Sequence, residues 1–580
     1  MTARIVTLLV AAMAVAASGP AGAPATTPPP PDRATVPAQQ AAHPGLSPAL
    51  NQLYDSFFGG ADPLRRAGLR HLVVNGDSVE VVVVSRPGRA VEAGNWVRQL
   101  GGRVETTYRD LAFATLPIAQ LTLLASDPSV LRVRTPHRSQ PDVVSEGVAV
   151  HHADMLHGQG VTGQGVKVGV LDCSGFSGYE ALLGSELPAQ VTLWTGGSDP
   201  VGSGIHGTGC AEIVYDMAPG AEMYLAHDGD EVEFYEAVDW LVAQGVAVIS
   251  YSCSGLGPYP GDGAGDPYNP YNQKVSDARD AGVLFVKSAG NYANGGNYQA
   301  WFEQLPGYNW HSFDGDWGNR YGYLDAGTSY YITLTWNDWP ADPLTQGSTQ
   351  NYNLGLYFWD GANWQIPASS MNPQSGQPGE LPFEEISFTP SVSEWYYLVI
   401  YDDGTTTPGY LSLRSYRNLF QHSNPEHSLY TPETPDGLTV GAVFWNGLGL
   451  EPFSSQGPLL GPGGVPNGGA LAPKLAGADG VSGVTYGMSN GQPWNGGGTG
   501  FFGTSAACPH VAGGAALLLS GSPGLTVDQL ESLLLAAATD MGPAGPDNQY
   551  GYGLMNVDIG LLFADGFESG DTSAWSTTVP

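Results

Sequence analysis

The sequence predicts an α/β protein built on a parallel β-sheet with helices on both faces, preceded by a small α+β domain and interrupted by an all-β sandwich. Near-continuous apolar runs at residues 166–172, 246–251 and 283–288 are typical of strands buried on both faces of a parallel sheet. They alternate with helical patterns, of which residues 231–244 are the clearest. Across residues 305–420 the helical period is lost, and short aromatic-rich strands with period two take its place.

Length and charge limit the organisation and the partners of the chain. With 580 residues it is long enough for about three or four domains, and a 42% share of hydrophobic residues supplies their cores. The chain carries 55 acidic and 21 basic residues, which gives a formal net charge of −34. Such a charge repels phosphate backbones, so we expect no nucleic-acid partner.

The N-terminus has the pattern of an export signal. Arg4 precedes an apolar run over residues 5–17, and Ala-x-Ala sequences follow at 14–16 and 21–23. This pattern predicts a secretory signal peptide over residues 1–23, and therefore an extracellular or periplasmic protein. The run is shorter than the ~20 residues that span a membrane, and no later segment is longer and as apolar, so no membrane span is expected.

A compact α+β domain is expected over residues 70–140, after a Pro- and Ala-rich linker with an N-terminal helix region over residues 24–69. The domain pattern predicts the order β-α-β-β-α-β, the split βαβ arrangement. Its strands are expected at 79–84, 103–108, 111–116 and 130–133, and its helices at 90–100 and 118–125.

The α/β pattern is split in two by the sandwich. The expected boundaries are 150–304 for the first α/β part, 305–420 for the sandwich, 428–562 for the second α/β part and 563–580 for a polar C-terminal tail. Alternation such as Ile332, Leu334 and Trp336 gives the insertion an apolar interior of its own. We therefore expect the insertion to be energetically separable from the α/β part.

The strongest chemical signal is the string Gly-Thr-Ser-Ala-Ala-Cys-Pro-His-Val-Ala-Gly at residues 503–513. It delivers Ser505 to the start of an apolar helix that runs to Leu519. At a helix start, unpaired backbone N–H groups and the helix dipole favour developing negative charge. A serine that merely caps the helix is the simpler interpretation of Gly-Thr-Ser alone, and the longer string disfavours it.

Three further polar residues occupy comparable places. Asp172 ends an apolar strand, at the edge where α/β sheets build their sites. His206 precedes a probable helix at residues 211–215, and Asn291 follows the run at 283–288. Each alone is equally typical of a turn, a cap or a core residue. Together with Ser505 they give the chain order Asp, His, Ser, which is one of the orders found for Ser-His-Asp triads.

On these residues the chain resembles the subtilisin-like serine peptidases, the subtilase family. The matching strings are Val-Gly-Val-Leu-Asp at 168–172, His-Gly-Thr at 206–208, Ser-Ala-Gly-Asn at 288–291 and the Gly-Thr-Ser string at 503–513, with weaker matches at 439–443, 453–458 and 551–557. The resemblance covers 150–300 and 430–560. It implies a subtilisin-like sheet, a catalytic triad of Asp172, His206 and Ser505, and an oxyanion hole formed by Asn291 and the Ser505 N–H.

Departures from the family pattern leave the catalytic groups in place. Cys173 stands where the family usually has Ser or Thr after the Asp, and Gly209 stands where a second His usually follows His-Gly-Thr. Ser505 is followed by Ala-Ala rather than Met-Ala. These departures bear on the substrate preference and on the detailed geometry of the site, which the resemblance alone does not imply.

The resemblance also implies partners and processing. Residues Ser252, Cys253, Ser254 and Gly255 would flank a polypeptide substrate as an extended strand, and backbone pairing of that kind accepts many sequences. The domain at 70–140 resembles the N-terminal inhibitor domains of the family. It implies a zymogen that is cleaved between residues 137 and 151 and inhibited by its own propeptide, with a permanent accessory domain as the alternative.

The four cysteines each lie close in sequence to one of these segments, so we expect all four near the site. They are Cys173, Cys210, Cys253 and Cys508. Four cysteines allow three pairings, of which we favour Cys173–Cys210 and Cys253–Cys508. A zinc site of four thiolates and free buried cysteines stay open as alternatives.

The expected function is that of a secreted serine endopeptidase made as a zymogen. No cofactor is required and no metal is expected in the site, although calcium is possible at Asp314 and Asp316 or at Asp402 and Asp403. The alternative function is a catalytically inactive scaffold whose sandwich binds carbohydrate or protein. The presence of all four catalytic groups favours the enzyme.

Overall fold

The computed structural model describes residues 43, 45–58, 74–75, 77–134, 143–404, 407–417 and 419–559. The predicted signal peptide, most of the linker, the first part of the expected cleavage zone and the C-terminal tail lie outside the described residues. Within the described residues the chain forms two compact units, one before and one after residue 142. None of the described helices combines the length and apolarity that crossing a bilayer requires.

The unit before residue 142 has the predicted α+β arrangement. Its elements are α1 (Pro48–Phe58), β1 (Val74–Asn75), β2 (Ser78–Ser85), α2 (Ala90–Gln99), β3 (Arg103–Tyr108), β4 (Leu111–Pro117), the 3₁₀ turn η2 (Ile118–Gln120), α3 (Leu121–Ala125) and β5 (Val130–Arg134). The sheet is antiparallel, with β2 between β4 and β5 and with β3 on the outer edge of β4. Leu50 and Leu53 of α1 are fully buried in its core, so this folded unit begins before the expected boundary at residue 70.

The unit after residue 142 contains the predicted parallel sheet, which confirms the α/β fold. Its strands are β6 (Lys167–Asp172), β7 (Thr192–Leu193), β8 (Glu222–His227), β9 (Val248–Tyr251), β10 (Leu284–Ser288), β19 (Leu438–Phe444) and β20 (Leu475–Asp479). They lie in the order β20-β19-β10-β9-β6-β8-β7, and every pairing is parallel. The chain order reverses at β6, which lies between β8 and β9.

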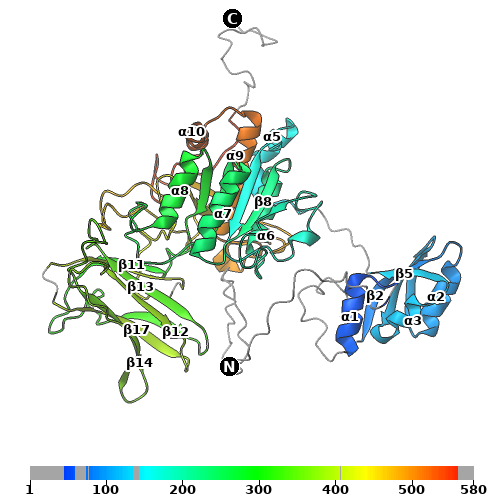
Figure 1. The fold of residues 1–580 in the computed structure, drawn as a ribbon, viewed down its shortest axis with the longest axis horizontal. Coiled ribbons are helices and arrows are strands. Elements are labelled where there is room, and N and C mark those ends of the chain that lie inside the picture. The colour runs from blue at the N-terminus through cyan, green and yellow to red at the C-terminus, as the bar shows by residue number, and fades with distance from the viewer. Residues whose placement is uncertain are drawn as a thin grey trace, which may run out of the picture. The chain divides into compact units, whose positions relative to one another are not determined.

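Helices cover both faces of this sheet (Figure 1). On one face lie α6 (His206–Met217) and α9 (Thr504–Gly521), and on the other lie α7 (Glu231–Gln244) and α8 (Pro270–Asp280). An apolar core lies on each face of the sheet, and successive strand residues point into one core and then the other. Val170 packs with α6 and α9, whereas Leu171 packs with α7. The unit also contains the helices α4 (Gly147–Val150), α5 (Ala153–Gly158) and α10 (Val527–Ala537) and the 3₁₀ turns η3 (Tyr179–Ala181) and η4 (Trp494–Gly496).

Helix α7 coincides with its predicted range because both of its ends are encoded locally. The Asp230 carboxylate accepts hydrogen bonds from the N–H groups of Val232 and Glu233, which satisfies two orphan donors of the first turn. Gly245 ends the helix with a φ of +74°, a conformation that glycine adopts without steric cost.

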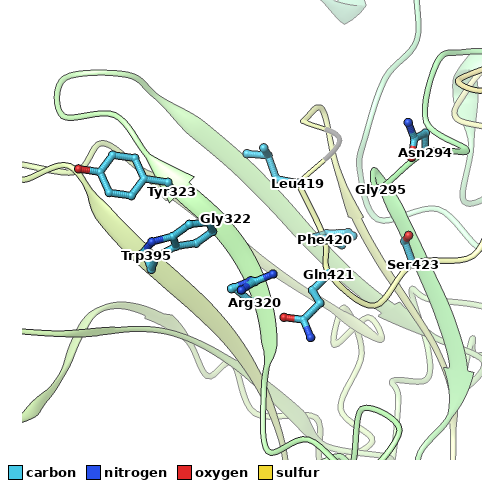
Figure 2. Close-up of a pocket in the computed structure, with 10 residues that line it drawn as sticks. All are labelled: Asn294, Gly295, Arg320, Gly322, Tyr323, Trp395, Leu419, Phe420, Gln421 and Ser423. Atoms are coloured by element: carbon cyan, nitrogen blue, oxygen red, sulfur yellow. The ribbon is translucent and has the colours of Figure 1, made fainter. Parts of the chain in front are cut away.

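The insertion is the predicted antiparallel sandwich. Its strands are β11 (Asn297–Trp301), β12 (Asn319–Leu324), β13 (Tyr330–Trp336), β14 (Tyr352–Trp359), β15 (Trp364–Ser370), β16 (Phe383–Phe388), β17 (Glu394–Asp402) and β18 (Tyr410–Ser415). They form two sheets, β11-β18-β13-β16 and β12-β17-β14-β15, around one apolar core. The first strand, β11, begins before the expected boundary at 305. A cavity of about 500 Å³ lies beside β12 and β17 (Figure 2).

The sandwich and the α/β part form one unit, which argues against the expected separability. Asn297 of β11 donates side-chain hydrogen bonds to the carbonyl oxygens of Asn424 and Glu426 at 3.0 and 2.9 Å. The rings of Tyr292 and Tyr430 stack with their centroids 3.8 Å apart, and the Tyr430 hydroxyl donates to the Gly296 carbonyl oxygen at 2.6 Å. The chain segments that enter and leave the sandwich are thus bonded to each other.

Candidate active site

Asp172 lies at the carboxyl end of β6, where the strand order reverses and where open α/β sheets form their sites. Its side chain is fully buried. Oxygen Oδ1 accepts hydrogen bonds from the N–H groups of Ser174 and Gly175 at 2.9 and 3.0 Å, and Oδ2 lies 2.5 Å from Nδ1 of His206. Both carboxylate oxygens are therefore held, and one of them is directed at the imidazole.

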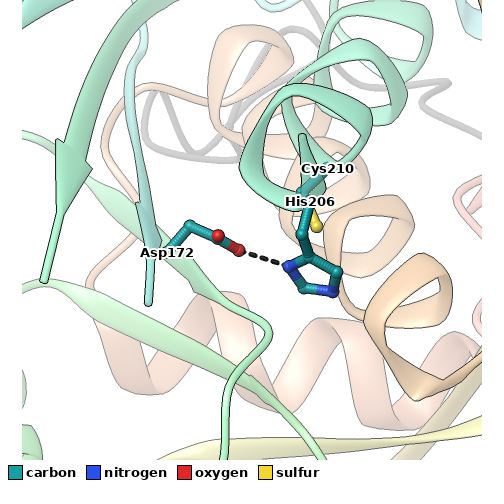
Figure 3. A group of neighbouring side chains, drawn as sticks. All are labelled: Asp172, His206 and Cys210. Atoms are coloured by element: carbon teal, nitrogen blue, oxygen red, sulfur yellow. Dashed lines mark hydrogen bonds and ion pairs between the residues drawn. The ribbon is translucent and has the colours of Figure 1, made fainter. Parts of the chain in front are cut away.

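His206 is the first residue of α6, and its ring points at Asp172 (Figure 3). Burial lowers the pKa of His206, but the charge of Asp172 and the hydrogen bond to it outweigh burial, so the pKa lies above its ordinary value. The next residue has no room for a side chain, because a Cβ at Gly207 would lie 2.8 Å from the Asp172 Cβ. Glycine at this position allows α6 to approach the end of β6.

Ser505 lies in the first turn of α9 and is 6% exposed. Its hydroxyl donates to the Ser252 carbonyl oxygen at 3.2 Å, and the Ser252 hydroxyl donates to the Ser505 carbonyl oxygen at 3.0 Å. Among the described contacts, no hydrogen bond joins Ser505 to His206. Cys210 links the two positions, because its thiol lies 3.5 Å from the Ser505 carbonyl oxygen and within 4.8 Å of a ring nitrogen of His206.

Asn291 follows β10 and lies against the start of α9. Its Oδ1 accepts hydrogen bonds from the N–H and the hydroxyl of Thr504, both at 3.0 Å. An N–H group can only donate, so this contact assigns the oxygen edge of the carboxamide to Thr504 and turns the NH2 edge away from it. A Cβ at Gly503 would lie 3.2 Å from Nδ2 of Asn291, and φ at Gly503 is +119°, so glycine keeps this side of the amide open.

Asp479 holds the turn that precedes the serine. It is the last residue of β20 and fully buried, and its Oδ2 accepts a hydrogen bond from the Gly503 N–H at 2.9 Å. Burial, and then the neighbouring Glu451 carboxyl, raise the pKa of Asp479 well above its ordinary range. Sequence reasoning missed this residue, because it lies 24 positions from its partner on a different element.

The predicted substrate segment, Ser252 to Gly255, directly follows β9 and is held by residues distant in sequence. The Gly255 N–H donates to the Thr431 carbonyl oxygen at 2.7 Å, and the N–H of the next residue, Leu256, donates to the Tyr416 hydroxyl at 2.8 Å. Tyr416 follows β18 directly, so the sandwich supports the segment. Nothing in the local sequence marks Tyr416 for this contact.

A buried lysine supports the same region. Nζ of Lys287, in β10, donates to the Tyr430 carbonyl oxygen at 2.5 Å, and burial lowers the pKa of Lys287. Tyr430 precedes Thr431, the partner of Gly255, and the Arg414 guanidinium of β18 lies 5.4 Å from the Tyr430 ring centroid. The sequence did offer a sign of this contact: Lys287 interrupts the apolar run at residues 283–288, and a buried amine requires hydrogen-bond partners.

The favoured disulfide pairing, Cys173–Cys210 with Cys253–Cys508, is wrong. The structure joins Cys173 to Cys253, and Cys210 and Cys508 are free buried thiols. The physical reason is strand register. Strands β6 and β9 are parallel neighbours that pair Leu171 with Tyr251, so the residues two positions further along each strand lie opposite one another.

Cys210 and Cys508 occupy the interior on the α6 and α9 face. Cys508 donates to the carbonyl oxygens of Tyr251 and Val286 at 3.6 and 3.4 Å. Burial raises the pKa of both thiols, Cys508 to about 11, so both are neutral. The disulfide itself closes a loop across 80 positions, and loops of that size are worth about 4.5 kcal/mol in the chain-entropy account.

Two groups of residues bear on metal binding. Among the described residues, Asp172, His206 and Cys210 are buried and close enough together to share an ion. Asp314 and Asp316, predicted as possible calcium ligands, instead flank His422, with carboxylate oxygens 3.3 and 2.8 Å from its two ring nitrogens. Calcium binding at the exposed acidic turns stays a prediction.

The model of the subtilase family matches residues 163–313 and 404–553, more than half of the chain, and these ranges include all four predicted catalytic residues. Among curated proteins, subtilisin E of Bacillus subtilis (strain 168) is 27% identical over 219 residues, which cover 35% of this chain and 55% of that protein. An extracellular serine protease of Serratia marcescens is 46% identical over 55 residues, 10% of this chain and 5% of that protein.

The matched regions thus span about half of the length of subtilisin E and a much smaller share of the Serratia marcescens protease. Among solved structures, the CspB protease of Clostridium perfringens aligns with a TM-score of 0.47 at 14% identity, over 70% of this chain and 98% of that chain.

Proposed function

The chain belongs to the subtilase family, and on that premise we propose that it is a serine peptidase which cleaves polypeptides with Asp172, His206 and Ser505. The observation that carries this proposal is the buried 2.5 Å hydrogen bond between Asp172 and His206. Such a bond fixes the imidazole tautomer and stabilises the imidazolium that forms when the serine is deprotonated.

The proposed reaction begins with a change of partner at Ser505. Its hydroxyl turns from the Ser252 carbonyl to His206, a step between staggered rotamers roughly 120° apart. His206 takes the proton as the oxygen attacks the scissile carbonyl, and then gives it to the leaving amine. The Asn291 NH2 and the Ser505 N–H stabilise the oxyanion, and loss of one such donor costs about 3–4 kcal/mol of transition-state stabilisation.

Replacement of the nucleophile tests the proposal. Ser505→Ala should abolish casein hydrolysis and labelling by a fluorophosphonate probe, and it should leave the precursor uncut. Ser520→Ala, at the other end of α9, makes the same substitution and should retain activity, because its hydroxyl bonds to the Leu517 carbonyl and the Gly163 N–H and to neither His206 nor Asn291 among the described residues. Full casein hydrolysis by purified Ser505→Ala protein would show that another residue carries the reaction.

The finer function that we propose is that of a secreted endopeptidase. An extended polypeptide would lie along the backbone of residues 252–255, so the scissile bond can be internal and many sequences are accepted. The name of the relative from Serratia marcescens, an extracellular serine protease, supports secretion, and so does the export signal expected at residues 1–23.

We also propose that the unit before residue 142 is an inhibitor of the enzyme. It has its own core, which includes α1, so a fragment over residues 43–134 should fold alone. The fragment should inhibit the mature enzyme competitively, and less well at high salt, because a Debye length of about 10 Å at 0.1 M screens its arginines from the acidic enzyme. Steady-state kinetics with added fragment is the measurement. Absence of inhibition at micromolar fragment would favour a permanent accessory domain.

One observation favours the alternative of an inactive scaffold. The Ser505 hydroxyl is bonded to Ser252 and not to His206 among the described contacts. A scaffold locked in that state would bind polypeptide or carbohydrate without reacting. Failure of the fluorophosphonate probe to label the folded, processed wild-type chain would select the scaffold over the peptidase.

A further inference from the structure

The sandwich has a cavity of about 500 Å³, and part of its wall is formed by Arg320 and Gly322 of β12 (Figure 2). Strand β12 carries a β-bulge between these two residues. A volume of this size is typical of ligand sites. Gly322 has a φ of +128°, and a Cβ there would lie 3.3 Å from the Leu419 side chain. The bulge and the missing side chain together keep this wall open, and bulges of this kind re-aim neighbouring side chains.

Arg320 is fixed in the cavity by aromatic rings rather than by an acid. Its guanidinium carbon lies 4.9 Å from the ring centroid of Trp395, and the Tyr323 ring meets Trp395 edge-on at 5.8 Å. Trp395 and Tyr323 are 44% and 49% exposed. Among the described residues no carboxylate forms an ion pair with Arg320, although acidic residues outnumber basic ones 55 to 21.

This combination favours an anionic ligand with apolar surface. A guanidinium over an indole ring has N–H donors left for bidentate recognition of a carboxylate. Gln421 and Asn294 line the same cavity, and each carries a side-chain amide that can hydrogen-bond a ligand. The exposed rings supply a surface on which the rest of the ligand can stack.

The cavity lies close to the proposed oxyanion hole along the chain. Asn294 is three residues after Asn291, so their backbones are at most ~11 Å apart. A cavity of this volume is ~10 Å across, so a group bound in it lies within about 20 Å of the oxyanion hole, the reach of roughly six extended residues. This separation is within the length of a polypeptide substrate whose scissile bond lies at the proposed oxyanion hole.

We propose that this cavity binds an acidic residue of the polypeptide substrate, several positions from the scissile bond, with its carboxylate on Arg320 and the neighbouring chain against Trp395 and Tyr323. The proposal rests on the proposed peptidase function. It gives the sandwich a role in selecting substrates that the triad itself does not supply.

Matched substrates test the proposal. Two 16-residue peptides share the sequence around the scissile bond and carry either Glu or Gln at the positions four to eight residues from it. Wild-type full-length enzyme, after processing, should cleave the Glu peptide with a kcat/KM at least fivefold higher, mainly through KM. Arg320→Gln and Trp395→Ala should remove this preference, whereas both variants should cleave a four-residue chromogenic peptide as the wild type does.

Lys274→Gln is the charge control, because it removes a cation that pairs with Asp239 on the distant helix pair α7 and α8. It should keep the preference for Glu. Equal cleavage of the two peptides by the wild type, or a preference that survives Arg320→Gln, would overturn the proposal. Arg320-dependent binding of polygalacturonate without a preference for the Glu peptide would reassign the cavity to acidic polysaccharide and would equally overturn it.

Failure of the proposed function gives a different result. In that case the wild type cleaves none of the peptides, including the four-residue one. The cavity is then tested by binding alone, through quenching of tryptophan fluorescence when the Glu peptide is added to Ser505→Ala protein. Quenching that Arg320→Gln abolishes would support the cavity, and no difference between the Glu and Gln peptides would overturn it.

Discussion

The protonation state of one residue, His206, decides when the proposed site can work. Only the neutral imidazole can take the serine proton, and Asp172 raises the pKa of His206 above its ordinary value of 6.5 despite burial. Activity should therefore fall as pH falls through that raised pKa. We expect the acid limb of kcat/KM to have an apparent pKa above 6.5, measured with a neutral peptide substrate.

Asp172→Asn provides the control for this pH prediction. It removes the charge that opposes burial, so the acid limb should move to lower pH. It also removes the carboxylate that sets the tautomer, so kcat should fall by about 10⁴-fold. An acid limb below pH 6.5 in the wild type, or one that Asp172→Asn leaves in place, would contradict the assignment of this limb to His206.

Single residues differ in how far the sequence predicts them. Asp172, His206, Asn291 and Ser505 could be found because each belongs to a short contiguous string, and the structure brings Asp172 onto His206 and Asn291 onto the turn before Ser505. Residues that act through distant partners carry no such string. Tyr416 was missed because its contact with Leu256 spans 160 positions.

At the scale of elements, periodicity predicted strands β6, β9 and β10 and helix α7, but it did not predict β8, α8 or β20. The reason is clearest for β20. Strand β20 was missed because Leu475–Asp479 is rich in Ala and Gly rather than in β-branched residues. The small residues are required by packing, because a Cβ at Gly477 would lie 2.5 Å from the Ala507 carbonyl oxygen. Helix α9 approaches the sheet so closely there that larger side chains are excluded.

The predicted substrate segment depends on another element, because Tyr416, which follows β18, holds the Leu256 N–H. Tyr416→Phe removes the hydroxyl that accepts from the Leu256 N–H and leaves the ring in place. A lost hydrogen bond of this kind is worth about 0.5–1.5 kcal/mol, so kcat/KM on peptides should fall roughly 2- to 10-fold, mainly through KM. The pH of the acid limb should not move, because His206 is untouched.

Tyr331→Phe is the matched control for the Tyr416 prediction. The Tyr331 ring stacks on Tyr416, but its hydroxyl bonds to Glu385 within the sandwich and not to the substrate segment. This variant should therefore retain peptide hydrolysis. Equal losses in the two variants would mean that the sandwich acts on the site only through its general stability.

At the scale of the whole molecule, the sandwich interior was predictable, but its attachment was not. Period-two alternation predicts an apolar core, and the structure has one. The same alternation does not report on the bonds at the edge of the sandwich, where Asn297 and Tyr430 tie the entering and leaving segments together. Each of those bonds joins a side chain to a backbone carbonyl oxygen more than 100 positions away, which no local pattern records.

The last prediction concerns removal of the sandwich. Loop length alone would tolerate replacing residues 297–415 with a Gly/Ser linker, because closure entropy grows slowly with length. The contacts argue otherwise. The deletion removes Arg414 from the Tyr430 ring and the Tyr331 ring from Tyr416, and these contacts steady the segment around Tyr430 and Thr431 that holds Gly255. We expect at least a tenfold loss of kcat/KM on a four-residue peptide and a lower melting temperature, measured by kinetics and calorimetry. A soluble deletion protein with wild-type activity would show that the substrate segment keeps its conformation without the sandwich.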